Sequence, residues 1–185
     1  DNRPENTSYD ADLKVYSIKV HLDRWKVFIR GPVNTPYENK WWHLIVNFPP
    51  TYPVDPPVIR FVSIPYHLNV SFEGRICLNC LEKGYLSTKH VVDILQEIKE
   101  LFLLPQKESA IQLEKLDLYQ NNYPEYERLA KQSTLENAKD DYNDYINCSI
   151  DDSIDDNFTL KLEEHVPPYM MSQISGKKIK DPVKA

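Results

Sequence analysis

The sequence of 185 residues has few cysteines: Cys77, Cys80 and Cys148. An odd, sparse set of thiols excludes a disulfide framework and predicts an intracellular protein, cytoplasmic or nuclear. Cys77 and Cys80 form a C-x-x-C pair, a pattern that can indicate zinc or a redox dithiol. A structural zinc site needs about four ligands, and the sequence has no second C-x-x-C and no closely spaced histidine pair. No βαβ pattern supports a redox dithiol, so we predict neither a metal nor a cofactor.

Long apolar runs and an excess of positive charge are also lacking. No run approaches the roughly 20 apolar residues that cross a bilayer, and no charged-then-apolar leader begins the chain. The formal net charge of −6 is opposite to the basic surface that binds nucleic acid. These absences predict a soluble protein without membrane or nucleic-acid partners. The length suffices for one domain with a sizeable core plus extra segments.

Apolar and polar residues alternate in the first half of the chain, separated by turn residues. The alternation predicts strands, which we place at residues 13–20, 25–29, 42–48 and 58–62. Short connections between them indicate a four-stranded antiparallel meander. The first segment, residues 1–12, is polar with an early proline and is predicted to be disordered.

Helical spacing replaces this alternation later in the chain. One apolar face predicts a buried amphipathic helix, formed by Val91, Val92, Leu95, Ile98, Leu101 and Phe102. Ser87 or Thr88 is expected to cap its N-terminus. A weaker helix is predicted at 110–118, and a third starts at Pro124, because proline suits the first helical position. Strands first and helices after predict one α+β domain over residues 13–137, with helices packed on one face of the sheet.

The C-terminal part of the chain changes composition twice. Residues 138–164 are rich in Asp and Asn and are predicted to form a flexible acidic linker. A calcium-binding loop is the competing interpretation, but the glycine and the final glutamate of that pattern are missing. Residues 165–185 resemble the opening of a U-box, a ligase module, through Val166-Pro-Pro-Tyr169 and Ile174-Ser-Gly176; a chance proline-rich tail is the alternative.

One constellation carries chemistry. His67-Leu-Asn69 precedes Cys77 by eight residues, within Gly74-Arg-Ile-Cys77-Leu. A thiolate is a nucleophile, and a side-chain amide can hydrogen-bond an oxyanion. Together they are the minimum for passing an acyl group through a thioester. Such a pair alone is weak evidence, because a cysteine in an apolar run is usually an inert core thiol and a loop asparagine usually bonds its own backbone.

The surrounding motifs strengthen this interpretation. The chain contains, in order, Trp25-Lys-Val-Phe-Ile-Arg-Gly-Pro32, Thr35-Pro-Tyr-Glu38, Phe48-Pro-Pro-Thr-Tyr-Pro53 and Pro56-Pro-Val-Ile-Arg-Phe61. In this order, ahead of His-x-Asn and the cysteine, they resemble the ubiquitin-conjugating enzyme family from about Trp25 to Ala130. The resemblance implies the UBC fold of that family and a transferase. Its partners would be ubiquitin or a ubiquitin-like protein, an activating enzyme that uses ATP, a RING or U-box ligase, and a substrate lysine.

The resemblance also implies roles for individual residues. Cys77 would carry the modifier as a thioester and yield it to a lysine amine or a ligase. Asn69 would support the oxyanion or order the active-site loop, and the sequence does not separate these roles. His67 is expected to be structural, its ring bonded to nearby backbone, rather than a general base. Cys80 falls where the family has an aliphatic residue and is expected to be a small buried hydrophobe.

Three positions depart from the family pattern. Leu68 replaces a proline that stiffens the turn, which predicts a more mobile loop. Tyr85 stands for a tryptophan and keeps an aromatic ring. The acidic residue that orients the incoming lysine maps to Ser109; Glu108 could substitute, and phosphorylation of Ser109 would restore negative charge.

Ligase docking in the family uses apolar side chains from two loops. These positions map to Val54 in the first loop and to Ser87 and Thr88 in the second. Because the family often has larger apolar residues there, we expect a less apolar docking surface and few ligase partners.

A non-catalytic module of the same fold is the rival hypothesis. Such a module would bind ubiquitin or a ligase without forming a thioester. The presence of both Cys77 and Asn69 favours the enzyme. Leu68, Ser109 and the lack of a legible amphipathic helix before Leu13, where the family has one that contacts the activating enzyme, favour the module.

Overall fold

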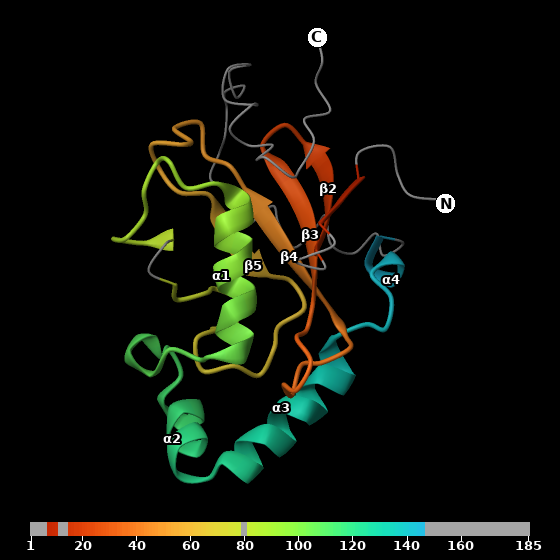
Figure 1. The fold of residues 1–185 in the computed structure, drawn as a ribbon, viewed down its shortest axis with the longest axis vertical. Coiled ribbons are helices and arrows are strands. Elements are labelled where there is room, and N and C mark those ends of the chain that lie inside the picture. Colours follow the sequence, from red (N-terminus) through yellow and green to blue (C-terminus); the bar gives the residue numbers. More distant parts are fainter. Residues whose placement is uncertain (1–6, 11–14, 79–80, 147–185) are drawn as a thin grey trace.

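The structure, a computed structural model, describes residues 7–10, 15–78 and 81–146. Its centre is an antiparallel sheet in which each strand pairs with the next along the chain (Figure 1). The strands are β1 (Thr7–Asp10), β2 (Val15–His21), β3 (Arg24–Arg30), β4 (Trp41–Asn47) and β5 (Val58–Phe61). The α+β fold and the meander are therefore confirmed, and four of the strands lie where the alternation predicted them.

The number of strands was predicted wrongly, and so was the disorder of residues 7–10 within the segment 1–12. Residues 7–10 form β1, which pairs with β2 from Thr7 opposite Ile18 to Asp10 opposite Val15. Main-chain hydrogen bonds alone can add a short strand to the edge of a sheet. The segment Thr-Ser-Tyr-Asp has no apolar alternation, so the sequence carried no signal for it.

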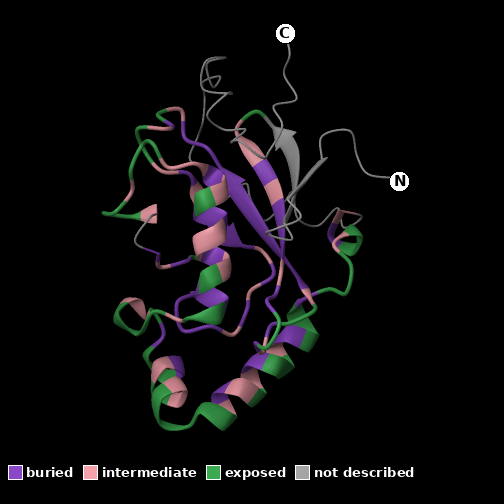
Figure 2. Ribbon diagram, in the orientation of Figure 1, coloured by how far each residue is buried: buried purple, intermediate pink, exposed green. Residues whose placement is uncertain are grey.

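The main core lies between one face of the sheet and helix α1 (Val91–Leu103). Successive side chains of a strand point to opposite faces, so Val27 and Ile29 of β3 share a face with their partners Leu44 and Trp42 of β4. These side chains are fully buried, and α1 adds its own buried face to them. Figure 2 shows the buried centre of the sheet with α1 lying across it. The predicted amphipathic helix and its packing on one face are thus confirmed.

The helix boundaries differ in detail from the expectation. Helix α1 begins at Val91 with His90 as its cap residue, and the His90 N–H donates to the Asp93 carboxylate at 3.1 Å. Ser87 and Thr88 are therefore not the cap, because the helix begins after His90. The Asp93 carboxylate accepts the His90 N–H, which no main-chain carbonyl of the helix could accept. The later helices are α2 (Leu113–Asn121) and α3 (Tyr123–Asn137), with Pro124 in the first turn of α3. None of the described helices is long and apolar enough to span a membrane.

The chain after α3 crosses to the other face of the sheet. The short helix α4 (Asn143–Ile146) places Tyr145 in a second, smaller core with Phe28 and Trp41, and the Tyr145 hydroxyl donates to the Trp41 carbonyl at 2.8 Å. Residues 138–146 therefore belong to the folded domain, which corrects the start of the predicted linker. Burial of the Tyr145 ring against Phe28 and Trp41 holds this segment on the sheet. The rest of the predicted linker and residues 165–185, with the U-box prediction, lie outside the described residues.

Candidate active site

Cys77 follows a tight turn made by Gly74. Gly74 has a φ of +83°, and a Cβ at this position would lie 2.0 Å from the Phe61 carbonyl oxygen, so the turn requires glycine. The chain then runs back beside itself, and the Cys77 N–H donates to the Asn69 carbonyl at 3.0 Å. This main-chain bond places Cys77 directly beside the His-x-Asn motif.

The thiol of Cys77 is accessible. Its neighbours Ile76 and Leu78 are buried in the core, whereas Cys77 is only half-buried, and its thiol is free of any disulfide. Burial of the residues before and after Cys77 fixes this segment on the core, and the Cys77 side chain points the other way, toward the surface. Cys77 is therefore not the sealed core thiol that a cysteine in an apolar run usually is.

A carboxylate lies beside this sulfur. The Glu82 Oε1 is 3.8 Å from the Cys77 Sγ, within the range of a weak S–H hydrogen bond. Partial burial raises the pKa of the Cys77 thiol, and the charge and hydrogen bond of Glu82 raise it further. The protonated thiol is thus the favoured form in the free protein. The sequence interpretation missed Glu82, since no motif links a glutamate five residues after a cysteine to the thiol.

Asn69 is completely buried, and its side chain ties two loops together. Its Oδ1 accepts the Gln106 N–H at 3.0 Å, and its Nδ2 donates to the carbonyls of Gln106 at 2.6 Å and Ser109 at 2.9 Å. Both amide hydrogens are therefore directed at main-chain oxygens. The arrangement corresponds to the loop-ordering role, one of the two that the sequence left open.

His67 lies deeper in the same network. Its Nε2 is 3.0 Å from the Leu101 carbonyl, and its Nδ1 accepts the Asn69 N–H at 3.0 Å. This pattern requires the neutral ring with the proton on Nε2. Complete burial lowers the pKa of His67 to about 4, so the ring stays neutral at physiological pH. The ring is bonded to backbone, as the sequence favoured, and is not placed to act as a base.

Leu68 holds the turn by packing. Its side chain is fully buried, and its carbonyl accepts the N–H groups of Ile111 at 2.9 Å and Gln112 at 3.2 Å. A proline at position 68 could accept the same two hydrogen bonds through its carbonyl. These bonds therefore do not depend on which of the two residues is present. Hydrogen bonds and burial therefore fix the turn that proline would stiffen.

Tyr85 joins the two loops expected to meet a ligase. Its hydroxyl donates to the Pro53 carbonyl at 2.9 Å, next to the exposed Val54. Ser87 and Thr88 are also exposed. Leu86, which the sequence interpretation missed, is 66% exposed and adds an apolar side chain to this surface. The docking surface is thus more apolar than Ser87 and Thr88 alone suggested.

Glu108 and Ser109 lie in a 3-10 turn, η2 (Lys107–Ser109), that Asn69 holds through the Ser109 carbonyl. Glu108 is exposed, and Ser109 is partly exposed. Among the described residues, the carboxylate in contact with the Cys77 sulfur is that of Glu82 and not that of Glu108. The structure therefore places the Ser109 carbonyl against the Asn69 side chain. The acidic residue beside the thiol is Glu82, which the sequence interpretation did not name.

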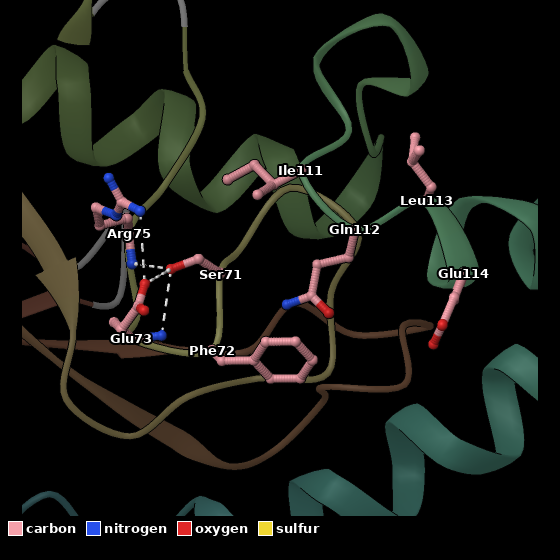
Figure 3. Close-up of a pocket in the computed structure, with 8 residues that line it drawn as sticks. All are labelled: Ser71, Phe72, Glu73, Arg75, Ile111, Gln112, Leu113 and Glu114. Carbon is pink, nitrogen blue, oxygen red and sulfur yellow. Dashed lines mark hydrogen bonds and ion pairs between the residues drawn. The ribbon is translucent and has the colours of Figure 1, made fainter.

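A pocket of about 450 Å³ opens between the Gly74 turn and the start of α2 (Figure 3). Exposed apolar side chains line it from both elements, Phe72 on one side and Ile111 and Leu113 on the other. The buried Lys115 Nζ lies 5.3 Å from the ring centroid of Phe72 and 4.4 Å from that of Tyr66. Burial lowers the pKa of Lys115 to about 8. Cys77, Asn69 and Glu82 do not line this pocket.

No group of three or more metal-binding side chains occurs within the described part of the chain. Cys80, the partner of Cys77 in the C-x-x-C pair, lies outside it. The absence of a metal at this position stays a prediction.

Comparison with known proteins decides the family. Residues 3–134 match the model of the ubiquitin-conjugating enzyme family. The chain belongs to this family. It is 34% identical to ubiquitin-conjugating enzyme E2 2 of Kluyveromyces lactis over 120 residues, which are 65% of this chain and 73% of that protein. It is 32% identical to ubiquitin-conjugating enzyme E2 2 of Neurospora crassa over 135 residues, 73% of this chain and 89% of the other.

A solved structure agrees. The E2 domain of a Toxoplasma gondii ubiquitin conjugating enzyme superposes with a TM-score of 0.64 at 30% identity, covering 69% of this chain and 90% of that chain. The sequence-based identification of the family and of a transferase is thus confirmed. The family match spans the sheet, both halves of the candidate site and most of α3.

Proposed function

We propose that this chain carries ubiquitin, or a ubiquitin-like protein, as a thioester on Cys77 and passes it to a lysine amine or to a ligase. The observation that supports this most is the accessible sulfur of Cys77, whose main-chain N–H donates to the carbonyl of Asn69, a residue with its side-chain amide fully hydrogen-bonded. Carriage as a thioester divides one acyl transfer into two easier ones. An activating enzyme would supply the modifier and use the ATP, so the chain itself needs no cofactor or metal.

Asn69 acts in this proposal as a positioning residue. Its amide fixes the loop of Gln106 and Ser109 against the Cys77 segment and so shapes the entrance for the amine. Direct stabilisation of the oxyanion would require Nδ2 to release one of its two carbonyl partners. Holding reacting groups in a fixed geometry is itself a large part of catalysis.

The remaining partners follow from the surfaces near the site. A RING or U-box ligase would contact Val54 and Leu86, with Ser87 and Thr88 at the edge, since the Tyr85–Pro53 hydrogen bond joins these two loops. The net charge of −6 gives no support to a nucleic-acid partner. The protein would work in the reducing cytoplasm or nucleus, where the Cys77 thiol stays available.

The rival function is a non-catalytic module that binds ubiquitin or a ligase. Two observations favour it: the raised pKa of the Cys77 thiol, which disfavours the nucleophilic thiolate, and Ser109 in the place of an acidic residue. Both the enzyme and the module could bind ubiquitin, so binding alone does not separate them.

A charging reaction separates the two functions. The chain would be incubated with activating enzyme, ATP and ubiquitin, and the product analysed with and without a thiol reductant. We expect a reductant-sensitive adduct with the wild type and with the matched control Cys80→Ser, and a reductant-resistant ester with Cys77→Ser. An uncharged wild type that still binds ubiquitin would support the module instead.

A further inference from the structure

Glu82 occupies a defined place beside the Cys77 sulfur. Its neighbour Leu81 packs against the core and donates its N–H to the Leu78 carbonyl at 2.9 Å, and the Glu82 carbonyl accepts the Tyr85 N–H at 3.2 Å. The backbone around Glu82 is therefore held by main-chain hydrogen bonds on both sides of the residue. Its side chain is exposed and extends to 3.8 Å from the Sγ.

The polar side chains of Asn69, His67 and Ser109 are hydrogen-bonded to the main chain or carry no charge. Both amide hydrogens of Asn69 point at main-chain carbonyls, and His67 is buried and bonded at both ring nitrogens. Ser109 has a neutral hydroxyl. Within the described residues, Glu82 is thus the ionisable side chain in contact with the reacting atom.

We propose that Glu82 is a catalytic residue of the transfer step, whose carboxylate orients the substrate amine and relays its proton to the Cys77 sulfur. The inference rests on the proposed thioester function. It assigns the acidic role to Glu82, five residues after Cys77, and not to Glu108 or Ser109 in the 3-10 turn.

The step balances without an external base. The neutral lysine amine attacks the thioester carbonyl carbon, a C–N bond forms, and the nitrogen gains positive charge. The Glu82 carboxylate accepts a proton from that nitrogen as the C–S bond breaks and its electron pair leaves on sulfur. Glu82 then returns the proton to the sulfur, giving an amide and the Cys77 thiol.

The hydrogen bond of the free protein corresponds to the end of this relay. The Cys77 S–H directed at the Glu82 Oε1 is the product arrangement, with the proton on sulfur and the carboxylate restored. The raised pKa of the Cys77 thiol favours return of the proton to the leaving sulfur. The same carboxylate opposes the thiolate needed for charging, so Glu82 affects the two half-reactions in opposite directions.

Glu82→Gln tests this by measuring the half-reactions separately. The protein would be charged with ubiquitin, ATP removed, and the loss of thioester followed after addition of free lysine. General acid–base catalysis contributes about 100-fold or more in many enzymes, so we expect discharge to lysine to fall at least about tenfold. Discharge to hydroxylamine should fall much less, because its attacking nitrogen becomes acidic enough to lose its proton to water without a positioned base. Alkylation of the uncharged Cys77 by iodoacetamide at neutral pH should become faster.

Two further variants control the result. Glu82→Asp keeps the carboxylate and should restore part of the lysine discharge, and Glu136→Gln, an exposed glutamate on α3, should behave as wild type. Unchanged lysine discharge in Glu82→Gln, an equal loss toward lysine and hydroxylamine, or a loss in Glu108→Gln instead would overturn the inference. If any of these results occurs while the wild type charges normally, only the role of Glu82 is contradicted. If the wild type never charges, the proposed thioester function is contradicted as well.

Discussion

The two sides of the Cys77 site are built on opposite principles. On the side toward α1, His67 and Asn69 are completely buried, and each polar atom of their side chains has a main-chain partner. On the other side, Cys77 is half-buried and Glu82 is exposed, joined by one long contact. Buried polar groups are costly unless satisfied, so the first side fixes geometry. The second keeps groups accessible for a substrate.

The comparison predicts the largest loss of stability for Asn69→Ala. This change removes three hydrogen bonds from a buried site and leaves the Gln106 N–H without its partner. We expect the free energy of unfolding to fall by about 3 kcal/mol, measured by denaturant unfolding. The matched control Asn121→Ala removes an exposed side-chain bond to Asp117 and should cost less than about 0.5 kcal/mol.

Asn69→Ala also separates positioning from chemistry. A misplaced loop should impair discharge to lysine at every lysine concentration while leaving the pH dependence of Cys77 alkylation unchanged. If Asn69→Ala is as stable as Asn121→Ala, the hydrogen bonds of Asn69 do not stabilise the buried side of the site.

The next effect is a dependence of stability on pH from His67. Its pKa is lowered from 6.5 to about 4 in the folded state, so the unfolded chain binds more protons between these values. Stability is therefore full above pH 6.5 and decreases as the pH falls toward 4, by about 1.4 kcal/mol per pH unit. Urea unfolding of the wild type and His67→Gln across this range should show a steeper decline in the wild type. Parallel declines would contradict a buried neutral ring.

A smaller effect is expected for Tyr85→Phe, at the junction of the two loops. The change removes the hydrogen bond to the Pro53 carbonyl and keeps the ring. We expect a loss of about 1 kcal/mol in the free energy of unfolding, with charging of Cys77 unaffected. A large loss of charging would place Tyr85 in the chemistry instead.

The smallest change in stability is expected on the exposed side. Glu82→Gln should alter the free energy of unfolding by less than about 0.5 kcal/mol, as exposed substitutions usually do, while lowering the pKa of the Cys77 thiol. Alkylation of Cys77 as a function of pH measures that pKa directly. A variant that is strongly destabilised, with an unchanged thiol, would reverse the comparison between the two sides.

The sequence predicted those parts of the fold that leave a periodic apolar pattern. The alternation in β3 and β4 and the helical spacing of α1 come from burial on one face, and the structure agrees with both. Strand β1 is only four residues long and has no apolar alternation, and Tyr145 is a single aromatic in an acidic stretch. Neither feature could be predicted from the sequence, because neither repeats at the spacing of a strand or a helix.

The site was predictable to a similar degree. The motif around Cys77 and Asn69 indicated which two residues meet, since the family resemblance fixes their spacing. The partners of Asn69 are main-chain groups of Gln106 and Ser109, 37 and 40 residues away, and backbone groups have no side-chain identity to recognise. Glu82 was missed because no sequence pattern links a glutamate five residues after a cysteine to its thiol.

Mass-spectrometric mapping of the charged protein tests the central claim most directly. After loading with ubiquitin, cleavage under non-reducing acidic conditions should yield a peptide with the C-terminal glycine of ubiquitin bonded to Cys77. Cys80 and Cys148 should carry no such group. An adduct on either of those residues, or no adduct at all after incubation with activating enzyme and ATP, would contradict the account.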